Sequence, residues 1–360
     1  MKLSVKTKKF ILKLFPIIGA FLFGAIVAVL VFQIIDIEKD QKINKPTNQQ
    51  IKKLVKQESE KETPKKVRAI DGVLIDESEE DAYPMAVTIE NNEKARPQSG
   101  LDQANLVIEA PVEGGITRFL AIFADNQEVK SIGPIRSARS YFLDWAQEFD
   151  ALYSHVGGSP EALKTIKNNY QIYNLNQYFQ SKYYWRSSKR NRPHNVYSSK
   201  ELLSQAVVDM KLKDPELGIW KFKDDLVLEE RPEITEDIVI DFSTYINQVE
   251  WRYLKESNEY LRYQAGKPHL TAEEGQIKAK NIVIQKTSIV SIDQEDRKKI
   301  KTIGSNKAII FLDGKTIEGT WEKPSIKKRT RFYDKNGSEI EFNRGTTWIE
   351  VVGNSVDLRY

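Results

Sequence analysis

Two arginines stand three residues apart in the segment GPIRSARSYF, which begins at Gly133. Arg136 and Arg139 enclose Ser137 at a point where an apolar, strand-like run gives way to a helical pattern. The free N–H groups of a first helical turn, together with two planar guanidinium groups, favour the binding of a phosphate or a carboxylate. These residues therefore predict an anion-binding site at the start of a helix.

A second motif, SHVGGSPEAL, contributes a histidine, two glycines and a serine. His155 ends a predicted strand, and Gly157 and Gly158 form the turn that follows it. Ser159 is the predicted N-cap of a helix whose first residue is Pro160. In open α/β sheets, ligands bind beyond the carboxyl ends of the strands. We therefore expect this turn and the arginine motif to line one ligand-binding site.

A third motif, RPHNVY, adds Arg192 and His194 from an extended, basic loop to the candidate ligand-binding residues. No two of the three histidines have a short metal-ligand spacing, so we expect neither a metal ion nor another cofactor. His155 is the candidate general base if the protein is an enzyme. That role requires an acid such as Asp150 or Glu113 to hold the ring in an open pocket.

The two arginines also have a structural interpretation, in which they pair with acids of the same chain. Glu109, Glu113 and Asp144 are the candidate partners. Cations at a helix N-terminus oppose the helix dipole at a cost of about 0.3–1 kcal/mol each, so an anion is expected beside them on either interpretation. We expect a division in which Arg136 holds Glu109 or Glu113, and Arg139 faces the cleft.

The N-terminal segment predicts a membrane anchor. Residues 14–35 read LFPIIGAFLFGAIVAVLVFQII without a charge, and about 20 apolar residues suffice to span a bilayer as a helix. Residues 1–13 form a flank with five lysines and no acid, which predicts a cytoplasmic N-terminus and an extracytoplasmic remainder. The apolar run is longer than a signal-peptide core of about 7–15 residues, so we expect it to be retained.

Composition excludes several classes of protein. The chain has no cysteine, which excludes disulfides, thiolate metal sites and a lipidated cysteine. The net charge is only +4, and five lysines belong to the membrane flank, so a nucleic-acid-binding protein is not expected. The predicted partners are the membrane, which the chain crosses once, and a cell-wall glycan or anionic polymer.

The exported part divides into regions that differ in composition and in their strand and helix patterns. Residues 36–70 are rich in Lys, Glu and Gln, which predicts a flexible tether. Residues 71–225 alternate strand and helix patterns, which predicts an α/β domain. After a connector at 226–235, residues 236–360 consist of strand-like runs separated by turns. They predict a second domain that is mostly antiparallel β.

The motifs together resemble those of the YerB-like lipoprotein family of the bacterial envelope. GPIRSAR, SHVGGSPEAL and RPHNVY stand in the first part of the chain, and GKPHL, FLDGKTIEGTW and GTTWIEVV stand in the second. The resemblance extends from Ala86 to the C-terminus and implies an envelope protein with paired N- and C-terminal domains of unknown function. Typical relatives in that family are attached through a lipidated cysteine, which this chain lacks, and a helix is expected to anchor it instead.

A much weaker similarity links the chain to the LytR-CpsA-Psr phosphotransferases, which also have an N-terminal span and an exported α/β domain. Those enzymes bind a polyprenyl pyrophosphate through arginines and an acid-bound metal. Ser137 stands where that family has an acid directly after its arginine. The similarity therefore does not extend to a metal site.

Two functions remain open on these grounds. The first is a membrane-anchored extracytoplasmic protein that binds an anionic or glycan envelope ligand, or that scaffolds other envelope proteins without catalysis. The alternative is an envelope enzyme, either a transferase or a hydrolase, that acts on phosphorylated or glycan substrates through an Arg/His site. No Ser-His-Asp set or pair of catalytic acids stands out in the sequence to favour the enzyme.

Overall fold

The computed structural model describes residues 64–360, except for residues 80, 170 and 234. The predicted flank 1–13, the predicted span 14–35 and most of the predicted tether lie outside the described residues. In the part of the chain that is described, no helix is long and apolar enough to cross a membrane. Residues 65–360 form one compact unit.

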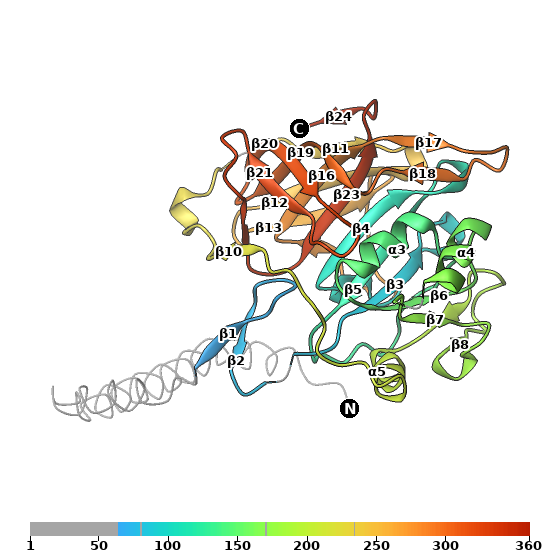
Figure 1. Ribbon diagram of the computed structural model, residues 1–360. Helices are drawn as coiled ribbons and strands as arrows, with labels where there is room; N and C mark the ends of the chain where they lie inside the picture. Colours follow the sequence, from blue (N-terminus) through green and yellow to red (C-terminus); the bar gives the residue numbers. More distant parts are fainter. Residues whose placement is uncertain (1–63, 80, 170, 234) are drawn as a thin grey trace, which may run out of the picture. The chain divides into compact units, whose positions relative to one another are not determined.

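A ten-stranded sheet organises this unit (Figure 1). The strands are, in spatial order, β21 (Arg331–Asp334), β20 (Lys315–Lys323), β19 (Gly304–Leu312), β16 (Asn281–Thr287), β23 (Thr347–Gly353), β4 (Leu106–Pro111), β5 (Thr117–Phe123), β3 (Met85–Glu90), β6 (Leu152–His155) and β7 (Asn174–Asn176). The pairs β16–β23, β23–β4, β3–β6 and β6–β7 are parallel, and the others are antiparallel. Strands from both predicted domains therefore share one sheet, joined where β23 pairs with β4.

A six-stranded antiparallel sheet packs against the C-terminal half of this sheet. Its strands are β14 (Lys267–Pro268), β13 (Glu259–Gln264), β12 (Gln248–Leu254), β11 (Ile238–Asp241) and β24 (Leu358–Arg359), with β15 (Lys278–Ala279) paired to β13. The side chains that alternate inward from β12 join one buried apolar cluster with those of the larger sheet. Trp251 of β12 and Trp348 of β23 meet in it, with their ring centroids 5.2 Å apart.

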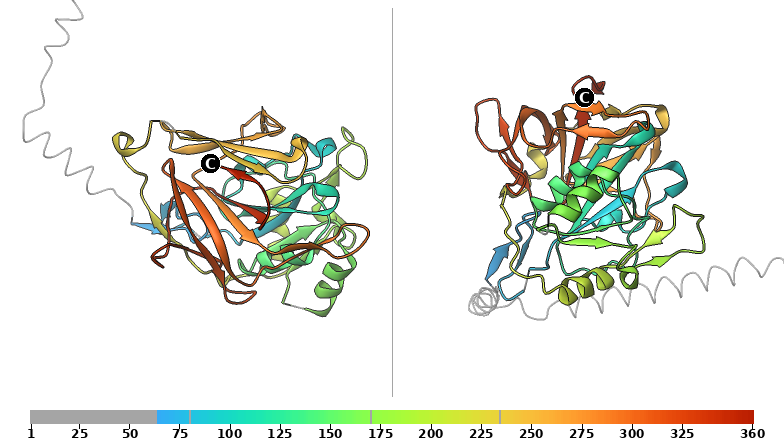
Figure 2. Two further views of the ribbon diagram at one scale, coloured as in Figure 1. Left: turned by 90° about the horizontal axis from the view of Figure 1, so that it is seen from above. Right: turned by 45° about the vertical axis from the view of Figure 1, so that its right-hand side comes forward.

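The described residues contain three α-helices, and all three belong to the N-terminal part. They are α3 (Ser140–Gln147), α4 (Pro160–Asn168) and α5 (Lys200–Asp209). Helix α3 lies across the N-terminal strands of the sheet (Figure 2). Its residues Phe142 and Trp145, with Phe149 just after it, enter a second buried cluster together with Leu120. The spacing of these three aromatic residues, three and four apart, is typical of one helix face.

The remaining elements are short. Two-stranded pairs are formed by β1 (Lys65–Val67) with β2 (Leu74–Asp76), β8 (Trp185–Arg186) with β9 (Val196–Tyr197), β10 (Lys221–Lys223) with β22 (Glu341–Asn343), and β17 (Ile289–Ser291) with β18 (Lys298–Ile300). The 3₁₀ turns are η1 (Glu93–Ala95), η2 (Leu101–Gln103), η3 (Glu113–Gly115), η4 (Ser181–Tyr183), η5 (Leu228–Glu230) and η6 (Tyr245–Asn247). The described unit is thus mostly β-structure with few helices, and antiparallel pairing dominates its C-terminal part, as predicted.

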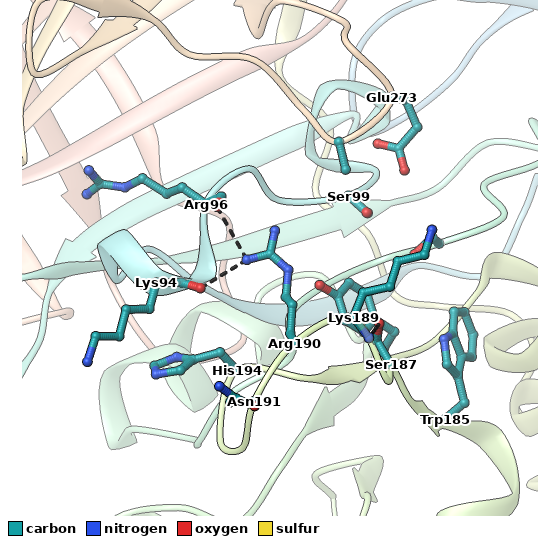
Figure 3. A pocket seen from close by; sticks show the side chains of 13 residues that line it. Lys94, Arg96, Ser99, Trp185, Ser187, Lys189, Arg190, Asn191, His194 and Glu273 are labelled. Atoms are coloured by element: carbon teal, nitrogen blue, oxygen red, sulfur yellow. Dashed lines mark hydrogen bonds between the residues drawn. The ribbon is translucent and has the colours of Figure 1, made fainter.

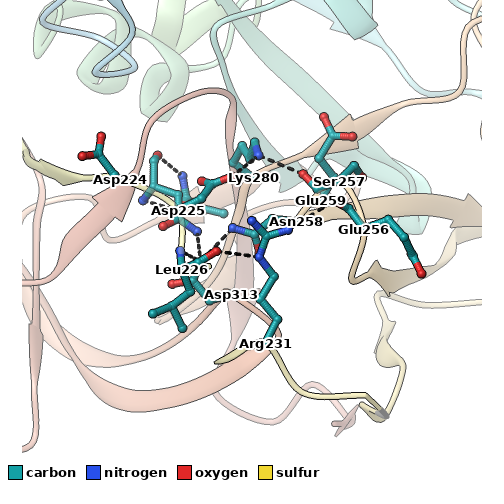
Figure 4. A network of polar contacts seen from close by, with 12 residues as sticks. Asp224, Asp225, Leu226, Arg231, Glu256, Ser257, Asn258, Glu259, Lys280 and Asp313 are labelled. Atoms are coloured by element: carbon teal, nitrogen blue, oxygen red, sulfur yellow. Dashed lines mark hydrogen bonds and ion pairs between the residues drawn. The ribbon is translucent and has the colours of Figure 1, made fainter. Parts of the chain in front are cut away.

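The predicted connector at 226–235 is bonded to the C-terminal strands (Figure 4). The backbone N–H of Leu226 donates to Asp313, and Arg231 donates to the carbonyl oxygens of Leu226 and Lys255 at 2.7 and 2.8 Å. Just before the connector, Asp225 pairs with Lys280. Whether residues 71–225 and 236–360 fold as separate domains stays a prediction.

Candidate functional site

The structure brings the first two motifs together. The backbone N–H of Ala138 donates to Gly157 O at 3.0 Å, and the N–H of Ser159 donates to Ala138 O at 3.1 Å. The N–H of Val156 in turn donates to Arg136 O at 3.0 Å. GPIRSAR and SHVGGSP therefore run side by side and lead into α3 and α4, which start next to each other.

Arg139 immediately precedes α3 and is fully engaged by an acid of the chain. Its Nε and Nη2 donate to the two oxygens of Glu113, both at 2.6 Å, and its Nη1 donates to Ala138 O at 2.7 Å. Partial burial opposes ionisation of Glu113, but the hydrogen bonds from Arg139 hold the pKa of that carboxyl below its usual value. Arg139 borders a small cavity of about 140 Å³ with Ser159, yet its guanidinium already has an anion.

Arg136 and His194 share one buried carboxylate. Arg136 Nε lies 3.0 Å from one oxygen of Glu90, and His194 Nδ1 lies 2.9 Å from the other. Glu90 is the last residue of β3 and is 1% exposed. The first and third motifs are therefore joined through this acid.

The expected division between the two arginines is wrong. Arg136 holds neither Glu109 nor Glu113, because its backbone N–H is bonded to Thr88 O at 2.8 Å, which places it beside the end of β3. Glu113 lies in the turn after β4 and pairs with the other arginine of the motif. Glu109 faces the six-stranded sheet, where it pairs with Arg262.

His155 is enclosed by the protein. Its Nδ1 lies 2.6 Å from Gly157 O and its Nε2 lies 2.6 Å from Asn174 Oδ1, and its ring stacks on Tyr153. Burial lowers the pKa of His155, so the neutral imidazole is favoured. No acid of the described residues contacts the ring, and the side chain is 0% exposed. His155 therefore lacks both conditions for a general base, the acid and the open pocket.

The glycines and serines of the motifs serve the local backbone. Gly157 has φ of +60°, and the ring of Tyr178 lies 2.8 Å from the point that its Cβ would occupy. Ser159 caps α4 by accepting from the N–H of Ala162 at 3.3 Å, as predicted, and Pro160 is the first helical residue. The carbonyl of Ser137 accepts a hydrogen bond from a buried arginine of β5. The Ser159 hydroxyl and the Ser137 carbonyl are thus used within the protein.

A cavity of about 930 Å³ opens beside His194 (Figure 3). It is lined by Lys94, Arg96, Ser99, Ser131, Trp185, Ser187, Lys189, Arg190, Asn191, His194, Tyr197, Ala272 and Glu273. The lining thus has four lysines and arginines but one carboxylate. A cavity of this size is in the range of sites that hold drug-sized ligands. Its charge favours an anion.

Arginines build the wall of this cavity, and lysines stand at its exposed rim. Arg190 donates to Lys94 O, Arg96 O and Pro97 O at 3.0, 3.3 and 2.6 Å, which fixes the loop between β8 and β9 (Figure 3). The guanidinium of Arg96 is bound to Asn91 and to backbone carbonyls. The side chains of Lys94 and Lys189 are exposed and remain available to a ligand.

The cavity also has an aromatic surface. Trp185 of β8 and Tyr197 of β9 stack with ring centroids 6.2 Å apart and an interplanar angle of 20°. Trp185 is 37% exposed, whereas Tyr197 is buried at 6%. The cavity therefore combines a flat apolar ring with several cations.

The structure places only one of the predicted site residues, His194, in this cavity. Arg192 is exposed but does not line it, whereas Lys189 and Arg190 of the same loop line it and were not among the predicted site residues. One sequence signal marks this region. From Ala162 to Lys200 the chain has no Asp or Glu but eight Lys and Arg, interspersed with aromatic residues.

Comparison with known proteins identifies the family. Residues 71–213 match the N-terminal domain, and residues 238–349 the C-terminal domain, of the family described as protein of unknown function DUF3048. The chain is 33% identical over 298 residues to the putative lipoprotein YerB of Bacillus subtilis (strain 168), covering 81% of this chain and 88% of that protein. The crystal structure of the Bacillus subtilis YerB protein matches with a TM-score of 0.73 and 30% identity, covering 82% of this chain and 100% of that one. The resemblance drawn from the motifs is thereby confirmed, and the chain belongs to the DUF3048 family.

Proposed function

We propose that this protein binds an anionic, sugar-containing polymer of the cell envelope in the cavity beside His194. The observation that carries the proposal is the combination of the exposed Trp185 face with four cations in one cavity. A neutral glycan would leave the cations of the cavity without an anion, and a small inorganic anion would leave the aromatic face without a contact. Sugar rings have apolar C–H faces that pack on aromatic rings, while phosphate or carboxylate groups bind Lys and Arg.

The cavity, rather than the start of α3, supports this binding. At the helix start, both oxygens of Glu113 already occupy Arg139, and Arg136 is bound to Glu90. In the cavity, the lysines Lys94 and Lys189 have exposed side chains. The arginine motif then contributes indirectly, because Glu90 links it to His194.

The proposed location is the extracytoplasmic side of the cell membrane. Support comes from the uncharged run at 14–35, the lysines of the 1–13 flank, and the name of the relative, a putative lipoprotein. On this proposal, the chain crosses the membrane once with its N-terminus in the cytoplasm. The tether at 36–70 then connects the span to the α/β region at 71–225 and the β-rich region at 236–360.

A titration with a defined polyanion tests the binding function. The probe is a synthetic oligomer of glycerol phosphate, added to the full chain in detergent micelles and followed by calorimetry. We expect Lys189→Ala to weaken binding by about 1.5–3 kcal/mol, the usual contribution of a charged hydrogen bond. Lys164→Ala is the matched control, because Lys164 is an exposed lysine of α4 that does not line the cavity. Equal effects of both substitutions would reject a specific site.

The pairing of His194 with Glu90 favours a second candidate, an envelope hydrolase or transferase. A histidine held by a buried acid at an open cavity has the geometry of a general base. His194 thus has the paired acid and the open pocket that His155 lacks. Turnover of a phosphodiester or glycan substrate that is lost in His194→Gln, with binding kept, would establish this candidate. Binding without turnover would leave the first.

A further inference from the structure

We infer that the cavity binds the anionic group of its ligand together with a proton, which His194 takes up. The ligand group would be a phosphodiester, an oxyanion that keeps one charge at every physiological pH. This inference rests on the proposed binding function and deepens it, because it names the charged group and the condition under which it binds.

The geometry fixes how His194 is oriented. Its Nδ1 lies 2.9 Å from Glu90 Oε2, and an ionised carboxylate only accepts hydrogen bonds, so Nδ1 carries a proton. Its Nε2 has no hydrogen-bond partner among the described residues, and His194 is one of the residues that line the cavity. When Nε2 is unprotonated, it can only accept a hydrogen bond and repels an oxyanion. When it is protonated, it donates a charge-assisted hydrogen bond to that oxyanion.

The other two histidines cannot take up this proton. His155 and His269 are buried, and both ring nitrogens of each have partners within the protein. Burial lowers the pKa of both imidazoles, so they stay neutral near pH 7. Free histidine titrates near pH 6.5, and the chain has no cysteine. Of the residues that line the cavity, His194 is the one with an imidazole, the side-chain type that can take up a proton between pH 5 and 8.

The charges that face His194 act in opposite directions. On the β3 side, Glu90 favours the imidazolium, although Arg136 shares and partly neutralises that carboxylate. Across the cavity, Glu273 also favours it. Asp102 lies against Gly275 of the loop that carries Glu273; burial raises the pKa of Asp102, and Glu273 raises it further.

Four cations of the lining, Lys94, Arg96, Lys189 and Arg190, disfavour the imidazolium while the cavity is empty of anions. A bound phosphodiester neutralises part of this positive charge and accepts a hydrogen bond from Nε2. Both effects favour protonation of His194 in the complex. Because binding and protonation are linked, the affinity for the anion must then rise as the pH falls.

Calorimetry of the full chain in detergent micelles tests this coupling, with the glycerol phosphate oligomer as the probe. We expect the affinity to be about tenfold higher at pH 5.5 than at pH 8.0, the gain of one charge-assisted hydrogen bond. Titrations in buffers with different ionisation enthalpies should show uptake of about one proton at intermediate pH. His194→Gln keeps a side-chain donor toward Glu90 but cannot gain a proton, so it should bind with no pH dependence. The control Glu201→Gln, at an exposed acid of α5 that does not line the cavity, should keep the pH dependence.

A second readout does not depend on how well the variant folds. The NMR signal of the His194 ring, followed against pH in the wild-type chain, should shift its midpoint upward when the oligomer is present. Three outcomes would overturn the inference while leaving the binding function intact. They are binding that does not depend on pH, a pH dependence that persists in folded His194→Gln, and an unchanged midpoint of the His194 signal. If the wild-type chain bound no oligomer at either pH, the proposed function would itself fail.

Discussion

Arg262 and Glu109 form a salt bridge in which both side chains are 0% exposed, with 2.5 Å between Nη2 and Oε2. The bridge joins β13 of the six-stranded sheet to β4 of the ten-stranded sheet. Aromatic rings of both sheets surround the guanidinium, which lies 5.7 Å from the Trp251 centroid and 5.2 Å from that of Trp348. Each charge of the pair compensates the other in this fully buried site.

Removal of one charge from this pair should therefore destabilise the whole unit. We expect Glu109→Gln to lower the free energy of unfolding by about 3–5 kcal/mol, because Arg262 would lose the carboxylate that pairs with it in this buried site. The measurement is urea denaturation followed by near-UV circular dichroism. Glu113→Gln is the comparison, since the Arg139–Glu113 pair is partly exposed and should cost less. If the two losses were equal, burial would not be the cause.

A second buried acid makes stability depend on pH. Burial raises the pKa of Glu350 well above its usual value, and the neighbouring Glu109 carboxylate raises it further. A raised pKa in the folded state means that this group stabilises the fold fully below about pH 4.3, the ordinary value for glutamate. That contribution to stability is lost progressively as the pH rises through the pKa that Glu350 has in the folded state.

We expect Glu350→Gln, which mimics the protonated acid, to remove this loss. The difference in unfolding free energy between the variant and the wild type should move in favour of the variant from pH 5 to pH 9. The comparison cancels the opposite effect of the buried histidines, whose lowered pKa values reduce stability as the pH falls. Denaturation curves at three pH values measure it, and a constant difference would show that Glu350 is ionised in the folded protein.

The shared sheet predicts a single unfolding transition for the described unit. β23 pairs with β4 from Thr347 to Glu350, so strands from the two predicted domains are adjacent in one sheet. Separation of the regions on either side of 226–235 would expose the edges of both strands and the Arg262–Glu109 pair. Scanning calorimetry should therefore show one cooperative transition. Two resolved transitions would instead establish the division into separate folding domains.

Local signals in the sequence were sufficient for several elements. Ser159 with Pro160 predicted the start of α4, and the spacing of Phe142, Trp145 and Phe149 is the local pattern that indicates the buried face of α3. These features depend on residues close in the chain. The pairing of β4 with β23 joins Glu109 to Glu350, and no local pattern reveals which apolar strands become neighbours over that separation.

The candidate site was predictable only in part for a related reason. His155 and His194 both belong to motifs with turn residues, and sequence alone does not show which ring is enclosed. The ring of His155 is bonded to Asn174, whereas the ring of His194 is oriented by Glu90, which lies 104 residues away in the sequence. The basic, aromatic run that supplies Trp185 was visible in the composition, but only the fold shows that it lines a cavity.

A pair of substitutions separates the structural arginine from the ligand-binding lysine. We expect Arg139→Ala to destabilise the protein by about 1–3 kcal/mol, because it leaves the half-buried Glu113 without its hydrogen bonds. The affinity for the glycerol phosphate oligomer should remain near the wild-type value. Lys189→Ala should keep the stability of the protein and weaken its binding of the oligomer. The exposed side chain of Lys189 lines the cavity without a bonded partner among the described residues.

Thermal denaturation and calorimetric titration of the same two preparations provide both readouts. An Arg139→Ala protein of normal stability that no longer bound the oligomer would move the site from the cavity to the start of α3. In that case the pair with Glu113 would open in solution, and the helix N-terminus with its arginine would bind the anion. The bidentate geometry argues against this, because a ligand would have to displace a carboxylate that the chain already positions at 2.6 Å from two guanidinium nitrogens.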